Sequence, residues 1–396
     1  MAKTPDTLLF RHNLVVLTTA QALGAASPPI IISLGGLIGQ QLSSTPALAT
    51  LPVSLFNLGL ALGTLPAAFL MRRCGRQAAY MIGALVAIIG ALVAFAGVYT
   101  QNFTTFCLGT LIAGYYAANV QSYRFAATDS ATEAQRAKAI SWVMIGGLIA
   151  AVVGPQTVIW TRNAFGGVPF AGSFLAQAVL AILAMIVLTR LRPTAPHTPQ
   201  PTDAPARSVG EMLRTPRFLL ALASGLVTYG LMVFVMTAAP IAMVGHGHGV
   251  DAAALGIQWH VLAMFLPSLV TSRLMARFGT ERMTAAGLVI IGLSAIAALG
   301  GFGLVNFYGS LVLLGIGWNF GFIGSTAMLT AAHAPSERAR AQGLNDFVIF
   351  GTVAIASFSS GALLNASGWV VINWMIFPAI ALVLAPLVWR IGRKTA

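Results

Sequence analysis

The sequence predicts an all-α membrane protein in which twelve transmembrane helices form two pseudo-symmetric six-helix bundles. Three observations lead to this fold class. Hydrophobic residues make up 57% of the 396 residues and charged residues only 8%, which is not the composition of a soluble protein. The apolar residues are collected in segments of about 20 residues, the length that crosses a bilayer. Short motifs in the first half of the chain also recur in the second half.

Charged or turn-forming residues separate the apolar segments from one another. Because a lipid-exposed backbone must satisfy its own hydrogen bonds, each segment is expected to be helical. The predicted spans are 14–38, 46–70, 77–99, 103–123, 139–161, 168–189, 217–244, 252–276, 283–303, 305–331, 342–365 and 369–389.

The basic residues indicate the orientation of these spans in a bacterial-type inner membrane. The net charge of +13 could suggest a nucleic-acid partner, but the positions of the charges argue against one. All 22 lysines and arginines except Arg162 fall in the tails and in alternate connections. The positive-inside rule then predicts a multi-pass protein with both termini in the cytoplasm and the lipid bilayer as its surroundings.

Composition also divides the chain into domains. The segment 191–216 is rich in proline, threonine and charge, and such segments favour an extended, solvated backbone. We therefore predict an N-terminal six-helix bundle over 1–190, a cytoplasmic linker over 191–216 and a C-terminal six-helix bundle over 217–396.

The two predicted bundles share sequence motifs at nearly constant spacing. The pattern L-M-x-R-x-G begins at Leu70 and again at Leu274, an offset of 204 residues. Arg136-Ala137-Lys138-Ala139 matches Arg338-Ala339-Arg340-Ala341 at an offset of 202. Membrane transporters built from two like halves usually bind substrate between the halves, near the middle of the bilayer.

Twelve spans, a central linker and a tight basic loop after the second span resemble the major facilitator superfamily over essentially the whole chain. The loop pattern of that family is G-x-L-a-D-R-x-G-R-K. The residues in register here are Ala68, Leu70, Arg73, Gly75 and Arg76. The resemblance implies transport by alternating access, without catalytic residues.

The chain departs from the family pattern at three places. Arg72 stands where the loop pattern has an aspartate. Gly154-Pro155 is similar to part of the family's antiporter motif, but Ala150 replaces its first glycine. Thr110 occupies the place of the span-4 arginine that is common in proton-coupled drug exporters, which argues against drug export.

In the resembled family the loop aspartate meets the start of span 11 and locks one state of the transporter. Here Arg72 replaces the aspartate and Asp346 lies one turn into span 11, so the two charges are predicted to have been exchanged. A lone carboxylate in a span can instead carry a proton, and this alternative stays open. The predicted gate residues are Arg72, Arg73, Arg76, Arg277, Arg338 and Asp346.

Polar and aromatic residues inside the spans are the candidates for substrate contacts. Tyr115 and Asn119 are spaced i, i+4 on one helical face, and so are Trp318 and Phe322. An amide inside a span can also simply bond to a neighbouring helix. The predicted substrate-cavity residues are Gln21, Asn57, Tyr115, Asn119, Tyr229, His260, Trp318, Asn319 and Phe322.

His260 is the one histidine well inside a predicted span. Its ordinary pKa near 6.5 would suit a proton-coupled step, although a neutral, hydrogen-bonded histidine is the commoner case. Protons are therefore an open alternative for the coupling ion.

The sequence contains no ATP-binding loop, nucleophile elbow or cluster of metal ligands, so we expect neither an enzyme nor a bound cofactor or metal. We predict a monomeric secondary transporter of a small organic solute that is neutral or modestly polar and could be aromatic. The alternatives are a proton-coupled multidrug efflux antiporter and, in another class, a non-transporting membrane receptor on the same fold.

Overall fold

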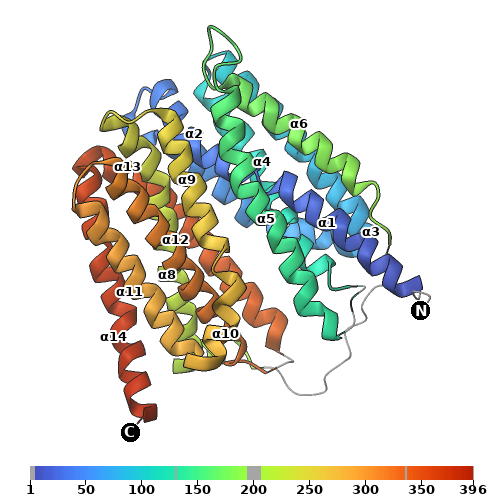
Figure 1. Ribbon diagram of the computed structural model, residues 1–396, viewed down its shortest axis with the longest axis vertical. Coiled ribbons are helices and arrows are strands. Elements are labelled where there is room, and N and C mark those ends of the chain that lie inside the picture. The colour runs from blue at the N-terminus through green and yellow to red at the C-terminus, as the bar shows by residue number, and fades with distance from the viewer. Residues whose placement is uncertain (1–4, 130, 132, 194–206, 335–336, 396) are drawn as a thin grey trace. The chain divides into compact units, whose positions relative to one another are not determined.

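A computed structural model describes residues 5–129, 131, 133–193, 207–334 and 337–395. These residues form helices and turns without any β-strand (Figure 1). The first half contains α1 (Pro5–Gly24), α2 (Ser27–Leu42), the short 3-10 helix η1 (Pro46–Leu48), α3 (Leu51–Tyr99), α4 (Phe103–Ala126), α5 (Glu133–Thr161) and α6 (Ala171–Leu188). The second half contains α7 (Val209–Leu213), α8 (Pro216–Gly245), α9 (Val250–Phe265), α10 (Ser268–Phe278), α11 (Thr280–Leu299), α12 (Leu304–Thr330), α13 (Arg338–Trp374) and α14 (Ile376–Thr395).

The predicted spans can be recognised in these helices. Eight helical stretches of the described residues are long and apolar enough to cross a membrane, and α9 with α10, bent by 42°, makes a ninth. The stretches Pro46–Tyr99 and Arg340–Arg393 are 54 residues long. Each of them holds two spans, because about 20 helical residues cross a bilayer. The less apolar α4 corresponds to the remaining predicted span, so the twelve-helix fold class is confirmed.

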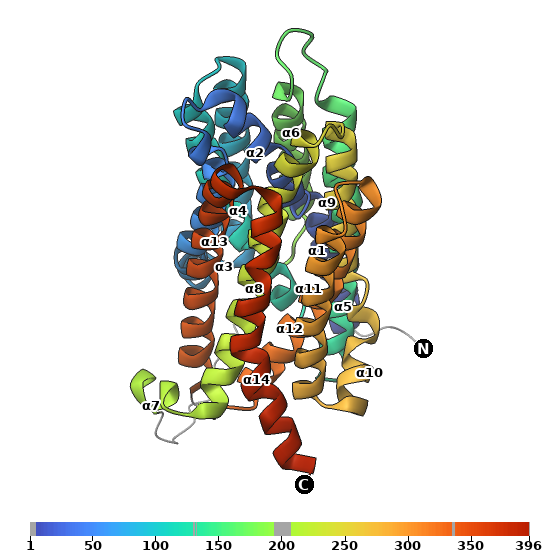
Figure 2. The ribbon, with the colours of Figure 1, turned by 90° about the vertical axis from the view of Figure 1, so that its left-hand side faces the viewer.

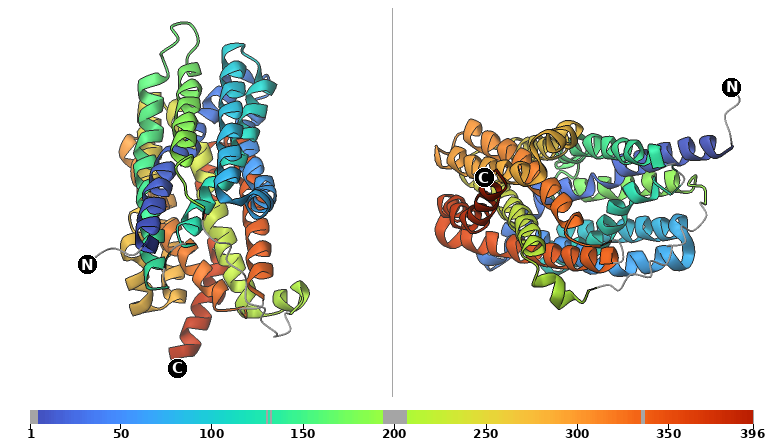
Figure 3. Two further views of the ribbon diagram at one scale, coloured as in Figure 1. Left: turned by 90° about the vertical axis from the view of Figure 1, so that its right-hand side faces the viewer. Right: turned by 90° about the horizontal axis from the view of Figure 1, so that it is seen from below.

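Glycines of the repeated motif interrupt the helices at corresponding places in the two halves. Gly75 inside α3 has φ 79° and ψ 165°, and Gly279 between α10 and α11 has φ 88° and ψ 152°. This region of backbone conformation is essentially restricted to glycine. The sequence repeat therefore encodes the same turn twice. Figure 3 shows, in blue, the two helical arms of α3 that meet at its break.

Glycines also allow neighbouring helices to touch through their backbones. A Cβ atom on Gly109 of α4 would lie 2.3 Å from the backbone nitrogen of Ala94 in α3. A Cβ atom on Gly287 of α11 would lie 2.3 Å from the backbone nitrogen of Gly321 in α12. Figure 2 shows α11 and α12 side by side. Small residues at such contacts are typical of membrane helix pairs.

The chain divides into two compact units. The first unit contains α1 to α6, and the second contains α7, α8 and α10 to α14. Helix α9 is divided, because its residues Ala253–Gln258 group with the first unit.

The short helix α7 lies within the segment that was predicted to be an extended linker. Its first turn is stabilised by a capping box: the Glu211 N–H donates to Ser208 Oγ over 3.2 Å, and the Ser208 N–H donates to Glu211 Oε2 over 2.6 Å. Because these reciprocal bonds satisfy two backbone N–H groups, this part of the linker forms a helical turn and not the extended, solvated backbone that was predicted.

Candidate functional site

Aromatic side chains from four helices gather in the second unit. Tyr229 of α8 meets Trp318 and Phe322 of α12 edge to face, with ring centroids 5.5 and 5.0 Å apart. Trp318 and Phe322 stack on each other at 5.1 Å. Phe350 of α13 lies 6.2 Å from Tyr229, and Phe265 of α9 lies 6.3 Å from Trp318. We call these five residues the aromatic cluster.

Sequence reasoning identified three members of the aromatic cluster and missed Phe265 and Phe350. Both missed rings lie on predicted spans, where a single phenylalanine is common and gives no signal of its own. Only the packing of α9 and α13 brings them next to Trp318 and Tyr229.

Trp318 has an unusual polar atom. Its side chain is 7% exposed, and its buried Nε1–H has no hydrogen-bond partner among the described residues. A buried donor without a partner costs free energy, so such a group in a folded protein calls for an explanation. A ligand oxygen next to the aromatic cluster would provide one.

Asn319, the neighbour of Trp318, uses its amide to hold the bend between α9 and α10. Its Nδ2 donates to Met264 O and to Ser268 Oγ, both over 2.6 Å, and its Oδ1 accepts from Thr271 Oγ1 over 2.6 Å. The side chain is fully buried. Both amide donors are therefore already used within the second unit.

His260 of α9 is also fully buried. Its Nδ1 lies 2.7 Å from the carbonyl oxygen of Leu311 in α12. Its Nε2 is buried without a hydrogen-bond partner among the described residues. A neutral ring that donates from Nδ1 fits these surroundings, because Nε2 then carries a lone pair and needs no acceptor.

The remaining cavity candidates belong to the first unit. Asn119 of α4 is fully buried, and its Nδ2 donates to Tyr115 O over 3.1 Å. The Asn119 Oδ1 and the Tyr115 hydroxyl have no partner among the described residues. Asn57 of α3 is buried and Gln21 of α1 is half-buried. These four residues stay predicted substrate contacts.

Arg76 forms an ion pair within the first unit. Its guanidinium contacts both carboxylate oxygens of Asp129, just beyond α4, with Nη2 2.9 Å from Oδ1. It also donates to the hydroxyl of Tyr80 over 3.2 Å, which accepts a second bond from Ser122 over 2.9 Å. This network connects the break in α3 with the end of α4.

The other gate candidates lie on exposed surfaces of their own units. Arg72 is exposed, and Arg73 lies over the ring of Phe69 at 5.8 Å. Arg277 lies over Phe278 at 5.3 Å, and Asp346 is exposed. The exchange of charges between Arg72 and Asp346 stays a prediction.

The side chain of Arg338 is outside the described part of the structure. Asp346 accepts a hydrogen bond from Nδ2 of its neighbour Asn345 over 3.2 Å.

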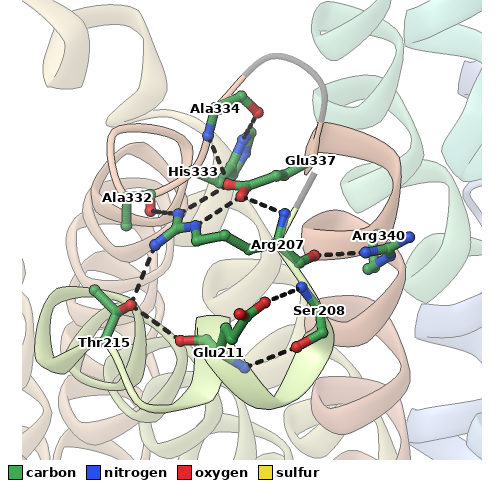
Figure 4. Close-up of polar contacts among 9 residues, drawn as sticks. All are labelled: Arg207, Ser208, Glu211, Thr215, Ala332, His333, Ala334, Glu337 and Arg340. Atoms are coloured by element: carbon green, nitrogen blue, oxygen red, sulfur yellow. Dashed lines mark hydrogen bonds and ion pairs between the residues drawn. The ribbon is translucent and has the colours of Figure 1, made fainter. Parts of the chain in front are cut away.

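Sequence reasoning missed the ion pair between Arg207 and Glu337 (Figure 4). Glu337 is 2% exposed, and its two carboxylate oxygens accept from Arg207 Nε over 2.6 Å and Arg207 Nη2 over 2.8 Å. The backbone N–H groups of Arg207 and Ala334 also donate to this carboxylate, over 3.0 and 2.9 Å. Together these contacts, the Arg207 side-chain bond first and the backbone bond from Ala334 next, lower the pKa of Glu337 to about 2.

Arg207 extends the contact to two more helix ends. It donates to Ala332 O just after α12 and to Thr215 Oγ1 just before α8, both over 3.2 Å. Arg340 of α13 donates to the carbonyl oxygen of Arg207 (Figure 4). The ion pair thus joins the end of α12 with the starts of α8 and α13, the helices that supply four of the five rings of the aromatic cluster. The sequence signal that could have indicated this ion pair is Glu337, the one acidic residue in the otherwise basic segment 336–340.

Comparisons with known proteins agree with this architecture. A family model described as Major Facilitator Superfamily matches residues 14–296. A relative from Brucella anthropi named riboflavin transporter RfnT is 63% identical, over 99% of this chain and 98% of the relative.

Two solved structures share the fold. A variant of the nucleoside transporter NupG aligns with a TM-score of 0.73 at 15% identity, covering 95% of this chain and 99% of that chain. The major facilitator superfamily transporter FucP, in the outward conformation, aligns with a TM-score of 0.61 at 17% identity, covering 96% of this chain and 99% of that chain.

Proposed function

This chain belongs to the major facilitator superfamily, and we propose that it carries riboflavin, or a flavin of the same chemistry, across a membrane by alternating access. As a member of that family it is a multi-pass membrane transporter and not an enzyme. The name of the relative points to one particular small molecule, which is more specific than the generic solute expected from the sequence. The relative lends no support to the multidrug efflux alternative.

The observation that carries the proposal is the aromatic cluster with the N–H of Trp318, which has no partner among the described residues. Riboflavin has a planar three-ring system with carbonyl oxygens at its edge. Aromatic side chains bind such a ring by stacking and by edge-to-face contacts. A ring carbonyl that reaches Trp318 would accept the hydrogen bond that no described residue of the protein accepts.

Charge supports the same substrate. No lysine or arginine occurs in the interior of a predicted span; Arg217 and Arg273 lie at span ends. Riboflavin is uncharged at neutral pH, whereas its phosphorylated form is an anion. An anion in a water-excluded site needs cationic partners, so the chain is expected to favour the unphosphorylated vitamin.

The orientation is part of the proposal. With both termini in the cytoplasm, the linker and the ion pair between Arg207 and Glu337 lie on the cytoplasmic side. The distribution of basic residues supports this orientation, because Arg162 alone falls on the other side.

The experiment that tests the proposal combines binding and transport. Replacing Trp318 with leucine removes both the ring and the N–H, so we expect riboflavin affinity to fall about 30-fold, equivalent to about 2 kcal/mol. Trp318→Phe keeps a ring and loses only the hydrogen bond, so it should cost about 1 kcal/mol. Riboflavin fluorescence measures binding, and uptake into proteoliposomes measures transport.

The matched control is Trp374→Leu, because Trp374 is a 59% exposed tryptophan of the same unit. It should leave binding unchanged. Unchanged riboflavin affinity in Trp318→Leu, or equal transport of riboflavin and its phosphate, would contradict the proposed site. Binding without transport by the wild-type protein would support the receptor alternative.

A further inference from the structure

A pocket opens at one end of the second unit, away from the aromatic cluster. Its wall comes from the starts of α8 and α11, the end of α12 and the last part of α14, and its cavity volume is about 170 Å³. The lining residues are Arg217, Thr280, Glu281, Met328, Ala331, Ala332 and Arg390.

The charges in this pocket are not balanced. Arg390 Nε donates to Glu281 Oε1 over 2.8 Å, and both side chains are largely buried. Arg217 makes no hydrogen bond or ion pair with any residue that the structure describes. Among its described lining residues, the pocket therefore holds one carboxylate for two guanidinium groups. The start of the 20-residue helix α11 adds partial positive charge through its first backbone N–H groups.

The pocket lies at the level where a membrane span meets water. The candidate spans begin at Pro216 and Thr280 and end at Thr330, each within two residues of the pocket wall. Next to Arg390, Trp389 is 61% exposed and lies under the guanidinium of Arg393 at 3.8 Å. Tryptophan and arginine at a span end are typical of the lipid headgroup region.

The two helices that carry Arg217 and Arg390 also expose large apolar side chains. Leu219 of α8 is 45% exposed, and Leu382 of α14 is 78% exposed. Large apolar groups that face outward from a membrane span contact acyl chains. The pocket thus offers cationic groups at the level of the headgroups, on helices whose spans also carry lipid-facing apolar side chains.

We propose that this pocket binds the headgroup phosphate of an anionic phospholipid, held between Arg217 and Arg390, with its acyl chains along the outer surface of α8 and α14. A zwitterionic lipid fits less well, because the carboxylate of Glu281 already pairs with Arg390. The exposed Arg282 and Arg393 nearby add to the attraction for an anion. This inference is independent of the transported substrate.

The test compares nanodiscs of phosphatidylcholine with nanodiscs that also contain phosphatidylglycerol with the same acyl chains. Phosphatidylglycerol should raise the unfolding temperature of the wild-type protein, because a ligand that binds only the folded state stabilises it. Arg217→Gln should lose at least tenfold in affinity for phosphatidylglycerol, measured by native mass spectrometry. This variant should fold normally, because Arg217 is exposed and forms no ion pair with the described residues.

The matched control is Arg214→Gln, which removes an exposed arginine outside the pocket wall. It should keep the response to phosphatidylglycerol. An equal loss in both variants would overturn the pocket in favour of diffuse surface charge. Equal stabilisation by phosphatidylcholine alone, or by inorganic phosphate in place of the anionic lipid, would overturn the assignment to an anionic phospholipid.

Discussion

At the scale of single residues, Glu337 shows how one carboxylate can join several chain segments. It accepts hydrogen bonds from the Arg207 side chain, the Arg207 backbone and the Ala334 backbone while it is almost fully buried. A buried charge is tolerated only when it is paired and hydrogen-bonded, and these bonds meet that requirement.

The lowered pKa of Glu337 predicts a pH-dependent contribution to stability. A carboxylate whose folded pKa is depressed stabilises the fold above its unfolded pKa, here about 4.3. That contribution is lost as the pH falls from about 4.3 towards the folded value of about 2. Glu337→Gln should therefore lower the unfolding temperature at pH 7, and the difference from wild type should shrink as the pH falls below about 4.

A double-mutant cycle provides the control for Glu337. Arg207→Gln should cause a similar loss, and the double variant should lose much less than the sum of the two single variants. Two outcomes would show that the ion pair does not stabilise the fold through the charge of Glu337. One is additive losses of stability in the double variant. The other is a difference in unfolding temperature between wild type and Glu337→Gln that does not change with pH.

At the scale of elements, the repeated motif acts through its glycine. Gly75 and Gly279 occupy corresponding places in the two halves and adopt nearly the same backbone angles. Each ends one helix and begins the next, so the motif sets where a span stops. The basic residues beside each glycine then keep the turn in water.

Replacing Gly279 with alanine should destabilise the second unit by about 1–3 kcal/mol, because a side chain is strained at φ 88° even where space is available. The matched control is Gly309→Ala in α12, where a Cβ atom meets nothing within 4 Å and φ is ordinary. Alanine should be neutral or slightly stabilising there. Thermal unfolding of the purified variants measures both effects, and equal unfolding temperatures would refute the argument from strain.

At the scale of the whole molecule, the transport cycle is expected to depend on contacts that form and break. The predicted exchange of charges between Arg72 and Asp346 belongs to this scale. Asp346→Asn should accelerate or uncouple transport and leave riboflavin binding intact, because it removes a latch and not a ligand. Riboflavin-induced thermal shift measures binding, and uptake with and without a pH gradient measures coupling.

The charge-reversed pair Arg72→Asp with Asp346→Arg is the control, because it restores opposite charges in the arrangement typical of the family. It should recover wild-type transport. Complete loss of riboflavin binding in Asp346→Asn would instead place Asp346 in the substrate or proton site.

The sequence by itself determined the membrane class, the number of spans, the internal repeat and the family. These properties follow from local facts: apolar segments must be about 20 residues long, basic residues stay in water, and a repeated glycine encodes a repeated turn. They need no knowledge of which helices touch. Trp318, Phe322 and Tyr229 could be identified in the same way, as aromatic residues well inside apolar segments.

Only the tertiary structure decided what the polar residues contact. Asn319 and Trp318 are neighbours in sequence, yet Asn319 holds the bend between α9 and α10 while the N–H of Trp318 has no partner in the part of the chain that the structure describes. Arg207 and Glu337 are 130 residues apart and meet only when three helix ends converge. The physical reason is that a hydrogen bond depends on distances of about 3 Å between groups far apart in the chain, which composition and spacing do not specify.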